Sequence, residues 1–490
     1  MLKKSILSAL ILALTASPII ACSDSDSNDS DTQSQTDGQK TDGQKTDGDK
    51  TDGQKTDGQK TDGQKTDGDK TDGQKTDGQD ANADFIKEIR SSKPYVKSDI
   101  KTADLESTVK GQYDLNFDLL RNSADQLGQN NAMISTFSIQ SALAMAWAGA
   151  KDKTAESMKK ALHFDDNTHK VFNKLNELIL SRRAEAIKTE YEDWDAIDIN
   201  ITNDMYFSPD HKWAESWLDI LSTNYNAGLT EMNFKADPEK ARKYINDAIS
   251  SATHDRIQDI LPDGSITVDT KSVLTNAIYF KAPWKGEFYK ATQKLSFNKL
   301  NAGKVDVDHI ETLGHFPYMK SDQYQALDIA LRDDSFNILM ILPENGEFES
   351  VQTSLSGDEI KSIMDKLETT RVSVDIPIFT FKTSVSLKKP LQALGMDIPF
   401  DPKNADFSGM TEDENDFFID QIYHKTFMGL DEKGIEAAAA TAVVMAGNSS
   451  VQVDPPVPFV LDRPFFFVVY EHESHTPMFV GRVMDPSAGK

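Results

Sequence analysis

The hydrophobic pattern of the chain changes from helical spacing in its first half to strand-like spacing in its second half. Residues 138–164 place apolar side chains at helical spacing, and Gly149 divides this stretch into two predicted helices. Residues 271–280 and 337–343 are continuous apolar runs, as strands buried on both faces require. Residues 372–385 alternate polar and apolar side chains, which predicts a half-buried strand.

The last apolar stretch, residues 464–485, predicts two strands joined by the polar turn HESHT. Helices first and long strands later indicate an α+β fold with large antiparallel sheets. No linker rich in Pro, Gly or Ser interrupts residues 81–490, so we expect this part of the chain to form one domain.

Residues 1–21 have the pattern of a secretory signal peptide. Lys3 and Lys4 precede an apolar stretch that is too short for a membrane span and ends at a small residue. Residues 19–22, IIAC, resemble the lipobox of bacterial lipoproteins, in which the cysteine becomes the lipidated N-terminus. The alternative is an ordinary signal cleaved near Ala21, but Cys22 is the only cysteine of the chain, which favours lipidation.

Residues 22–80 are of low complexity, and nine copies of TDGQK or close variants run from Thr36 to Asp80. No window there contains enough apolar residues to offset the entropy of ordering the chain, so we expect a disordered tether. A lipid on Cys22 would anchor the exported protein to the bacterial membrane. Ser23 after the cysteine favours the outer membrane of a Gram-negative cell, with the protein facing the periplasm or the cell exterior.

Composition and motifs argue against several classes of function. The net charge is −26 and no cluster of Lys or Arg interrupts it, which argues against a nucleic-acid partner. The motifs G-x-S-x-G and H-E-x-x-H, a phosphate-binding loop and a dinucleotide fingerprint are absent, and no cysteine follows Cys22. We therefore expect no enzyme, no cofactor and no metal, although a hydrolase with dispersed catalytic residues stays open.

Residues 431–443, DEKGIEAAAATAV, are almost all small and have no amphipathic face to bury against a core. A short helix is one interpretation of this run, because alanine is the best helix former. Read alone, the run does not decide between a helix and a segment that needs small side chains for another reason.

Several blocks in the same order resemble the serpin family over nearly the whole of residues 81–490. Residues 131–138, NAMISTFS, are similar to the first signature block of the family, and residues 276–284, NAIYFKAPW, to a central-sheet strand and its following tryptophan. A block at residues 245–257 is also similar, although Asp255 stands where a glycine is usual. The remaining blocks are residues 424–425, residues 431–434, and the closing hairpin at residues 463–465 and 479–483.

The resemblance implies a serpin fold, with helices around three mostly antiparallel sheets and an exposed reactive-centre loop. It also implies inhibition of serine-type endopeptidases by a suicide-substrate mechanism. The protease cuts the loop, forms an acyl-enzyme, and is trapped when the cut loop inserts as a new strand into the central sheet. Small residues suit such a strand, since a charged side chain would be buried without a partner. The resemblance assigns the loop hinge to Glu432, Gly434, Ile435, Glu436, Ala437, Ala438, Ala439, Ala440 and Thr441.

One hinge residue departs from the family pattern, because Ile435 stands where inhibitors usually carry Thr or Ser. Its bulk keeps open the alternative of a non-inhibitory serpin that acts as a binding or chaperone-like protein. The resemblance further assigns control of sheet opening to four residues. Ser135, Asn246 and His424 occupy positions of a hydrogen-bonded cluster beneath the sheet, and Trp284 stands where the loop first enters.

The usual loop length of the family places the reactive bond at Asn448-Ser449, with Met445-Ala446 as the alternative that better suits an apolar pocket. No Lys or Arg occurs in residues 434–462. A trypsin-like pocket with its buried carboxylate would find no partner there. We therefore expect an elastase-, chymotrypsin- or subtilisin-like target and a monomeric inhibitor.

Overall fold

The computed structural model divides the chain into two units after Thr76, and the described residues all lie in the second unit, Asp77–Lys490. Among them, no helix combines the length and the apolar character that crossing a membrane needs. The predicted signal peptide and the whole of the predicted tether, with Cys22, lie outside the described part. The structure describes residues 85–188, 193–209, 211–300, 303–413, 417–436 and 455–489.

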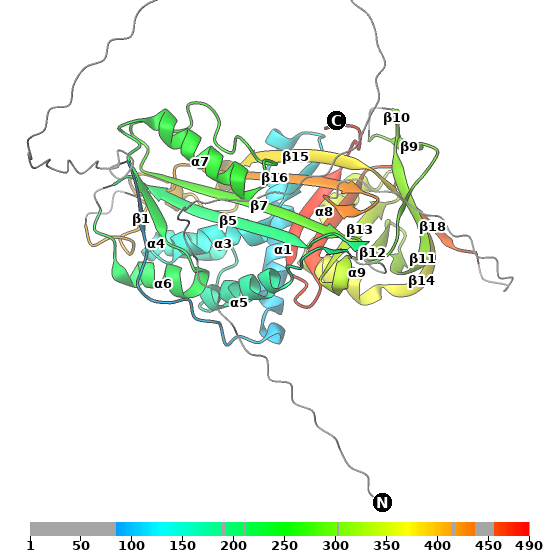
Figure 1. The fold of residues 1–490 in the computed structure, drawn as a ribbon, viewed down its shortest axis with the longest axis horizontal. Helices are drawn as coiled ribbons and strands as arrows, with labels where there is room; N and C mark the ends of the chain where they lie inside the picture. The colour runs from blue at the N-terminus through cyan, green and yellow to red at the C-terminus, as the bar shows by residue number, and fades with distance from the viewer. Residues whose placement is uncertain are drawn as a thin grey trace, which may run out of the picture. The chain divides into compact units, whose positions relative to one another are not determined.

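A seven-stranded sheet, here called the central sheet, contains the first residues of the predicted hinge (Figure 1). In order across the sheet its strands are β1 (Ile86–Ile89), β6 (Leu229–Met232), β5 (Asp198–Phe207), β7 (Ser272–Pro283), β17 (Gly434–Ile435), β16 (Ile422–Asp431) and β15 (Phe379–Ser386). Neighbouring strands are antiparallel except for two pairs, β5 with β6 and β7 with β16.

A nine-stranded sheet forms the other large sheet of the described residues. Its strands in order are β18 (Val457–Val460), β14 (Glu368–Pro377), β11 (His309–Lys320), β12 (Tyr324–Ala330), β13 (Phe336–Pro343), β19 (Phe465–Glu471), β20 (Pro477–Val483) and β2 (Ala132–Ile134), with β8 (Tyr289–Lys290) beside β11. Every residue of β13 is buried, so the prediction of a strand without an exposed face is confirmed there, and the two strands predicted in residues 464–485 are present as β19 and β20, which are also fully buried. Two ribbons pair β9 (Leu295–Asn298) with β10 (Lys304–Val307) and β3 (Ile187–Lys188) with β4 (Asp193–Trp194).

The helices come mainly from the first half of the chain, as the hydrophobic pattern predicts. The two helices expected around Gly149 are present as α3 and α4, and Ser135 caps α3 by accepting a hydrogen bond from the Ser138 N–H. The α-helices are α1 (Glu106–Asn122), α2 (Ala124–Leu127), α3 (Thr136–Trp147), α4 (Asp152–Ala161), α5 (Thr168–Ser181), α6 (Glu215–Tyr225), α7 (Pro238–Ala252), α8 (Phe348–Ser354), α9 (Gly357–Lys366) and α10 (Lys388–Ala393). Single 3-10 turns occur at Thr102–Asp104, Arg332–Asp334 and Ile398–Phe400.

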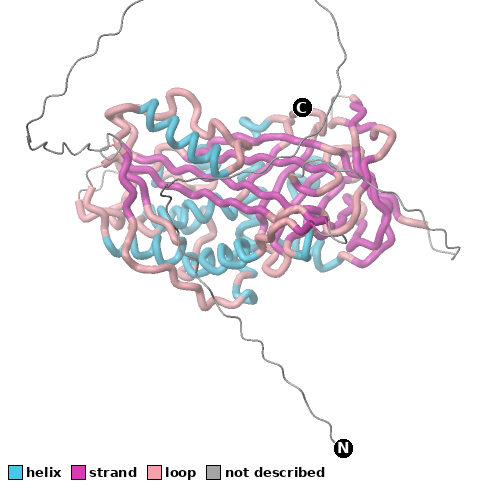
Figure 2. The backbone as a smooth tube through the Cα atoms, in the orientation of Figure 1, coloured by secondary structure: helices cyan, strands magenta, loops and turns pink. Residues whose placement is uncertain are grey.

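Helices cover both faces of the central sheet (Figure 2). On the outer face, Ile245 of α7 packs in one cluster with Val273 and Ala277 of β7. On the inner face, Leu274 and Ile278 of the same strand belong to the main hydrophobic core, where α3 lies against β5 and β7. Alternate side chains of β7 therefore enter two different clusters, which explains why the strand reads as a continuous apolar run.

The prediction of a single strand over residues 372–385 is wrong. The chain forms β14 up to Pro377 and then β15 from Phe379, and the two strands belong to different sheets. Between them the Ile378 N–H donates to the Asp308 carbonyl at 2.8 Å. The buried side chains are at even-numbered positions up to Ile376 and at odd-numbered positions from Pro377 onward, so the alternation shifts by one residue where the chain changes sheet. The predicted α+β fold with mostly antiparallel sheets is confirmed.

Candidate functional site

The predicted hinge begins as a short strand inside the central sheet. β16 ends at Asp431, and a turn at Glu432 and Lys433 reverses the chain. Gly434 and Ile435 then form β17, which lies between β16 and β7 and pairs antiparallel with both. The first hinge residues therefore already occupy a strand position between two neighbouring strands.

Ile435 faces Leu430 of β16 on one side and Ala282 of β7 on the other. The side chain is 3% exposed and belongs to the main hydrophobic core. Full burial of an isoleucine side chain stabilises a structure by about 1.5–3 kcal/mol. The residue that departs from the family pattern is thus accommodated where the hinge enters the sheet.

Gly434 has a conformation and surroundings that suit only glycine. Its φ is +150°, and a Cβ there would lie 2.6 Å from the Cα of Pro283 and also against the carbonyl oxygen of Ala282. Any other residue would push β17 away from β7. This position depends on the absence of a side chain because two backbones approach closely.

Trp284 holds the turn that leads into β17. Its backbone N–H donates to the Lys433 carbonyl at 2.9 Å, and its Nε1–H donates to the Asp431 carbonyl at 2.8 Å. The indole is buried and packs on Phe288 with ring centroids 4.8 Å apart. The predicted position of Trp284 next to the hinge therefore corresponds to direct hydrogen bonds to the hinge backbone.

Glu436 ends the described part of the hinge and carries an ion pair that sequence reasoning missed. Its backbone N–H donates to the Gly429 carbonyl at 2.8 Å, and its carboxylate, 7% exposed, binds the Arg256 guanidinium. Burial raises the pKa of the Glu436 carboxyl, and the Arg256 charge opposes that rise. Arg256 lies over the Phe427 ring of β16 at 5.2 Å and so spans the outer face of the sheet.

Arg256 follows a turn in which Asp255 replaces the glycine of the family pattern. Asp255 has a φ of +61°, the left-handed region that favours glycine. Its N–H donates to the Ser250 carbonyl, and the Ser250 hydroxyl donates to its carboxylate, both at 2.8 Å. These two local hydrogen bonds let an aspartate occupy the position, because Asp tolerates this region better than most residues.

Beyond the hinge strand, β7 and β16 pair directly with one another. Residues 274–278 of β7 lie parallel to residues 422–426 of β16. Within this stretch, His424 Nδ1 and Asn276 Oδ1 are 2.7 Å apart, and the Ser135 N–H donates to His424 Nε2 at 3.1 Å. A buried polar cluster therefore joins the two strands to the start of α3.

The hydrogen bonds assign the protonation state of His424. Its Nε2 accepts from a backbone N–H, so Nδ1 carries the only ring proton and donates to Asn276. Burial lowers the pKa of His424 to about 3, which keeps the ring neutral at physiological pH. A second proton would convert the accepting nitrogen into a donor facing the Ser135 N–H.

The polar cluster differs in membership from the predicted set. Ser135 and His424 belong to it, but Asn246 does not, because its side-chain amide makes both of its hydrogen bonds to the backbone of Leu261. Asn246 lies on α7 and ties that helix to the chain that follows. Sequence reasoning missed Asn276, although an asparagine in the middle of an apolar strand is a signal that could have revealed it.

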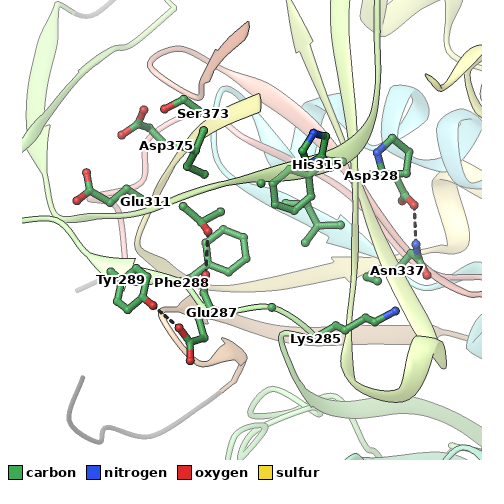
Figure 3. A pocket seen from close by; sticks show the side chains of 18 of the residues that line it. Lys285, Glu287, Phe288, Tyr289, Glu311, His315, Asp328, Asn337, Ser373 and Asp375 are labelled. Atoms are coloured by element: carbon green, nitrogen blue, oxygen red, sulfur yellow. Dashed lines mark hydrogen bonds between the residues drawn. The ribbon is translucent and has the colours of Figure 1, made fainter. Parts of the chain in front are cut away.

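A cavity of about 1110 Å3 lies beside the turn that Trp284 holds (Figure 3). Lys285 lines one wall and binds Asp334 at 2.7 Å, while Glu311 and Asp375 of the nine-stranded sheet line another. The lining is rich in charged groups, which suits solvent and ions better than an apolar ligand. We assign no role in the loop mechanism to it.

Several predicted site residues lie outside the described part of the chain. They are the hinge residues Ala437, Ala438, Ala439, Ala440 and Thr441, the reactive bonds Asn448-Ser449 and Met445-Ala446, and the lipidation site Cys22.

Comparisons with known proteins agree with the geometry. The chain is 34% identical over 401 residues to an uncharacterized serpin-like protein of Thermococcus kodakarensis, covering 81% of this chain and 91% of that protein. It is 31% identical over 381 residues to the leukocyte elastase inhibitor of Sus scrofa, covering 75% and 97%. The native-state crystal structure of the thermophilic serpin tengpin superposes with a TM-score of 0.68 at 23% identity, covering 81% and 97%. The family model described as Serpin (serine protease inhibitor) matches residues 110–486, and the chain belongs to the serpin family.

Proposed function

We propose that this protein inhibits serine-type endopeptidases as a suicide substrate, by inserting its cleaved loop between β7 and β16. The observation that carries the proposal is the position of Gly434 and Ile435, which already pair with both strands at one end of the seam between them. The serpin family includes inhibitors such as the leukocyte elastase inhibitor. Because the first hinge residues of this chain already lie between β7 and β16, insertion of its cleaved loop would begin at that position.

The two registers of β17 continue to the same place along the seam. If the pairing of β17 with β7 is extended along the chain, Ala439 lies opposite Ile278. If the pairing of β17 with β16 is extended in the same way, Ala439 lies opposite Thr426. Ile278 and Thr426 are partners of one another in the present structure. A strand that extends from Ile435 would therefore separate existing partners one pair at a time and would require no shift of either neighbour along its length.

The register also decides which face each inserted side chain would meet. Ile435 points to the inner face and Glu436 to the outer face with Arg256. Because strand side chains alternate, Ala437, Ala439 and Thr441 would enter the core, whereas Ala438 and Ala440 would lie under α7 on the outer face. Small residues are required most strictly at the inner positions.

Insertion would be favourable overall. About ten new ladder hydrogen bonds at about 0.5–1.5 kcal/mol each contribute on the order of 10 kcal/mol. The five residue pairs that now join β7 to β16 would be lost, but each strand would gain the new strand as its partner. The present structure, in which β7 and β16 pair with one another, is then kinetically trapped, and cleavage of the loop releases it.

The polar cluster lies in the middle of the stretch where β7 and β16 pair, on the path of the new strand. Continuing the register brings Thr441 between Asn276 and His424, whose hydrogen bond to one another would break. A threonine hydroxyl both donates and accepts, so it could replace the partner that each loses. Stretching a trapped protease over this distance would pull its catalytic groups apart, and a shift near 1 Å already costs about a hundredfold in rate.

The target that best fits the loop is an elastase-, chymotrypsin- or subtilisin-like enzyme, because residues 434–462 contain no Lys or Arg. The test is to mix the protein with each enzyme and with trypsin, and to run denaturing gels. A covalent band of summed mass with the first group, and none with trypsin, is the expected result. Mass spectrometry of the released fragment then distinguishes Asn448-Ser449 from Met445-Ala446.

The same experiment tests the non-inhibitory alternative. Complete cleavage of the loop with full survival of every protease would show that the protein is a substrate and would leave a binding role. The burial of Ile435 within β17 does not favour that alternative, since its side chain is already accommodated in the sheet. If the protein instead hydrolysed a substrate repeatedly without being cleaved itself, it would be a hydrolase.

We further propose that a lipid on Cys22 anchors the protein and that residues 22–80 act as its tether. The proposal rests on the sequence IIAC and on the repeats up to Asp80. Replacing Cys22 by Ala should release the protein from bacterial membranes into the soluble fraction. A variant that fractionates with the membrane as before would contradict the anchor.

A further inference from the structure

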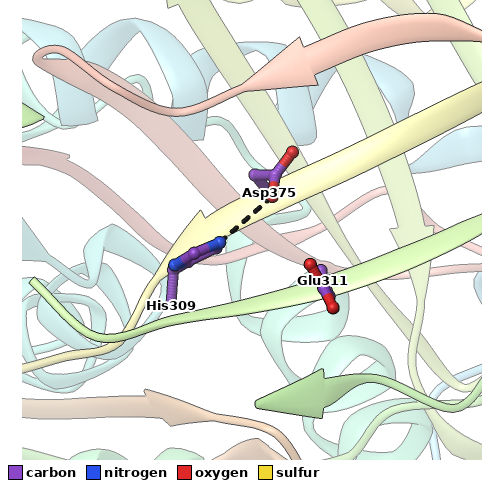
Figure 4. Close-up of side chains that lie close together, drawn as sticks. All are labelled: His309, Glu311 and Asp375. Carbon is purple, nitrogen blue, oxygen red and sulfur yellow. Dashed lines mark ion pairs between the residues drawn. The ribbon is translucent and has the colours of Figure 1, made fainter. Parts of the chain in front are cut away.

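A separate cluster of polar side chains lies where β11 and β14 pair in the nine-stranded sheet. Glu311 and Asp375 are direct partners across these strands, and His309 precedes Glu311 by two residues on the same face. One ligand atom from each of the three side chains lies within 4.8 Å of the other two. Figure 4 shows the His309 ring directed at Asp375 with Glu311 beside them.

The negative charge of this cluster is not balanced by a protein cation. Two like charges directly opposite on neighbouring strands destabilise a sheet. Among the described residues, the Glu311 carboxylate has no hydrogen bond or ion pair, and the Asp375 carboxylate has only His309 as a partner. The nearby Lys290 binds Asp308 instead. A positive charge at this point would resolve the repulsion.

His309 supplies the observation that points to a bound ion. The residue is 7% exposed, and its Nδ1 has no hydrogen-bond partner. Its Nε2 lies 3.2 Å from Asp375 Oδ1. Nε2 faces the Asp375 carboxylate and no hydrogen bond holds Nδ1, so the ring proton can move to Nδ1 when a cation takes its place beside Nε2, which frees the Nε2 lone pair for that cation.

We propose that His309, Glu311 and Asp375 bind a divalent transition-metal ion of the zinc class. A zinc ion with ligands at about 2.0–2.2 Å and tetrahedral angles sets neighbouring ligand atoms about 3.4 Å apart, close to the separation of the His309 and Asp375 atoms. The exposed Glu311 side chain reaches the third position by rotation, and water takes the fourth. The imidazole favours zinc over magnesium or calcium, which bind oxygen ligands.

The position of the site connects it to the strand that follows the reactive loop. The Asp375 carbonyl accepts the Leu461 N–H at 2.9 Å, and Asp375 pairs with Val460 of β18. A metal ion here would therefore join β11 to β14 beside β18. This inference stands apart from the inhibitory function, since metal binding does not require the loop to insert.

The test is isothermal titration calorimetry of the full chain with zinc chloride, repeated with magnesium and calcium chloride. One zinc ion per chain is expected, with at least about tenfold weaker binding in Glu311→Gln, because a ligand is lost. Glu311→Gln is the decisive variant, since Glu311 is exposed and has no protein partner whose loss could unfold the sheet. Cobalt added in place of zinc should give the visible absorption of a tetrahedral site.

The matched control is His315→Ala, which removes an exposed histidine of the same strand outside the cluster. It should leave zinc binding unchanged, whereas His309→Gln should abolish it. The proposal is overturned if zinc does not bind, if Glu311→Gln binds it as tightly as the wild type, or if magnesium or calcium binds equally well. Each outcome can be read without any protease assay.

Discussion

The two ends of the seam between β7 and β16 are built differently. At the hinge end, Ile435 fills the core, and Trp284 holds the turn by two hydrogen bonds to its backbone. At the other end the strands pair directly, and a polar cluster around His424 and Asn276 joins them. The first end is filled by apolar packing, and the second is held by hydrogen bonds.

This difference shows how a sheet can be stable and still able to open. Apolar packing cannot be exchanged for water without a large cost, so the occupied end stays closed. A hydrogen bond between His424 and Asn276 can be exchanged for bonds to an arriving strand at little net cost. The buried polar groups between β7 and β16 thus mark the place where the hydrogen-bond partners of these strands can be exchanged for those of an inserted strand.

The largest expected effect comes from a charge on the inner face of the inserted strand. Ala439→Arg would bury an unpaired charge, which costs about 3–5 kcal/mol and slows insertion roughly a hundredfold or more. The variant should be cut at the wild-type rate without forming a covalent complex. Ala438→Arg, on the outer face, is the matched control and should inhibit far better. Equal inhibition by both variants would contradict the deduced register.

Disruption of the polar cluster around Asn276 and His424 should have the next largest effect. Asn276→Ala leaves the ring N–H of His424 without its acceptor and should lower the free energy of unfolding by about 2–3 kcal/mol. Urea unfolding followed by circular dichroism measures this change. Asn404→Ala, which removes an exposed amide that binds only Asp401, should change stability by less than about 0.5 kcal/mol. Similar losses of unfolding free energy in both variants would show that the polar cluster contributes no more to stability than an exposed hydrogen bond does.

Acid should destabilise the polar cluster, because protonation of His424 is unfavourable in the folded protein. Its pKa falls from an ordinary value near 6.5 to about 3 on folding, so below pH 6.5 the unfolded chain binds the proton more readily. The contribution of neutral His424 to the free energy of unfolding is therefore fully present above pH 6.5, and it falls by about 2 kcal/mol between pH 7 and pH 5. His424→Gln should remove that part of the pH dependence, measured as the difference between wild-type and variant urea midpoints. His315→Gln, at an exposed position, should leave the profile unchanged.

The smallest expected effect is that of the ion pair over the hinge. Arg256 is about half exposed, so solvent screens its bond to Glu436, and Arg256→Gln should change stability by about 1 kcal/mol or less. Because the pair lies where the strand enters, the variant should alter the rate of covalent complex formation more than the melting temperature. Lys243→Gln, which removes a surface lysine of α7 with a 3.9 Å contact to Glu239, is the control. An unchanged rate would mean that the pair does not guide insertion.

Much of the fold could be predicted because its local signals are strong. The helix break at Gly149 and the apolar runs of β7 and β13 are present as expected. The change of sheet at Pro377 was missed, although the alternation of buried side chains shifts by one residue there. Asn246 was placed in the polar cluster from the family pattern alone, and its true partner, Leu261, lies on its own side of the sheet.

The sequence by itself determined the strands and helices, the small residues of the hinge and the absence of basic residues from the loop, because these depend on neighbours along the chain. Only the tertiary structure decided that Ile435 is buried, that Arg256 binds Glu436 and that Asn276 binds His424. Those contacts join residues that are far apart in sequence and depend on strand register. Hydrophobic period reports which face a side chain takes, but not which partner it meets across the sheet.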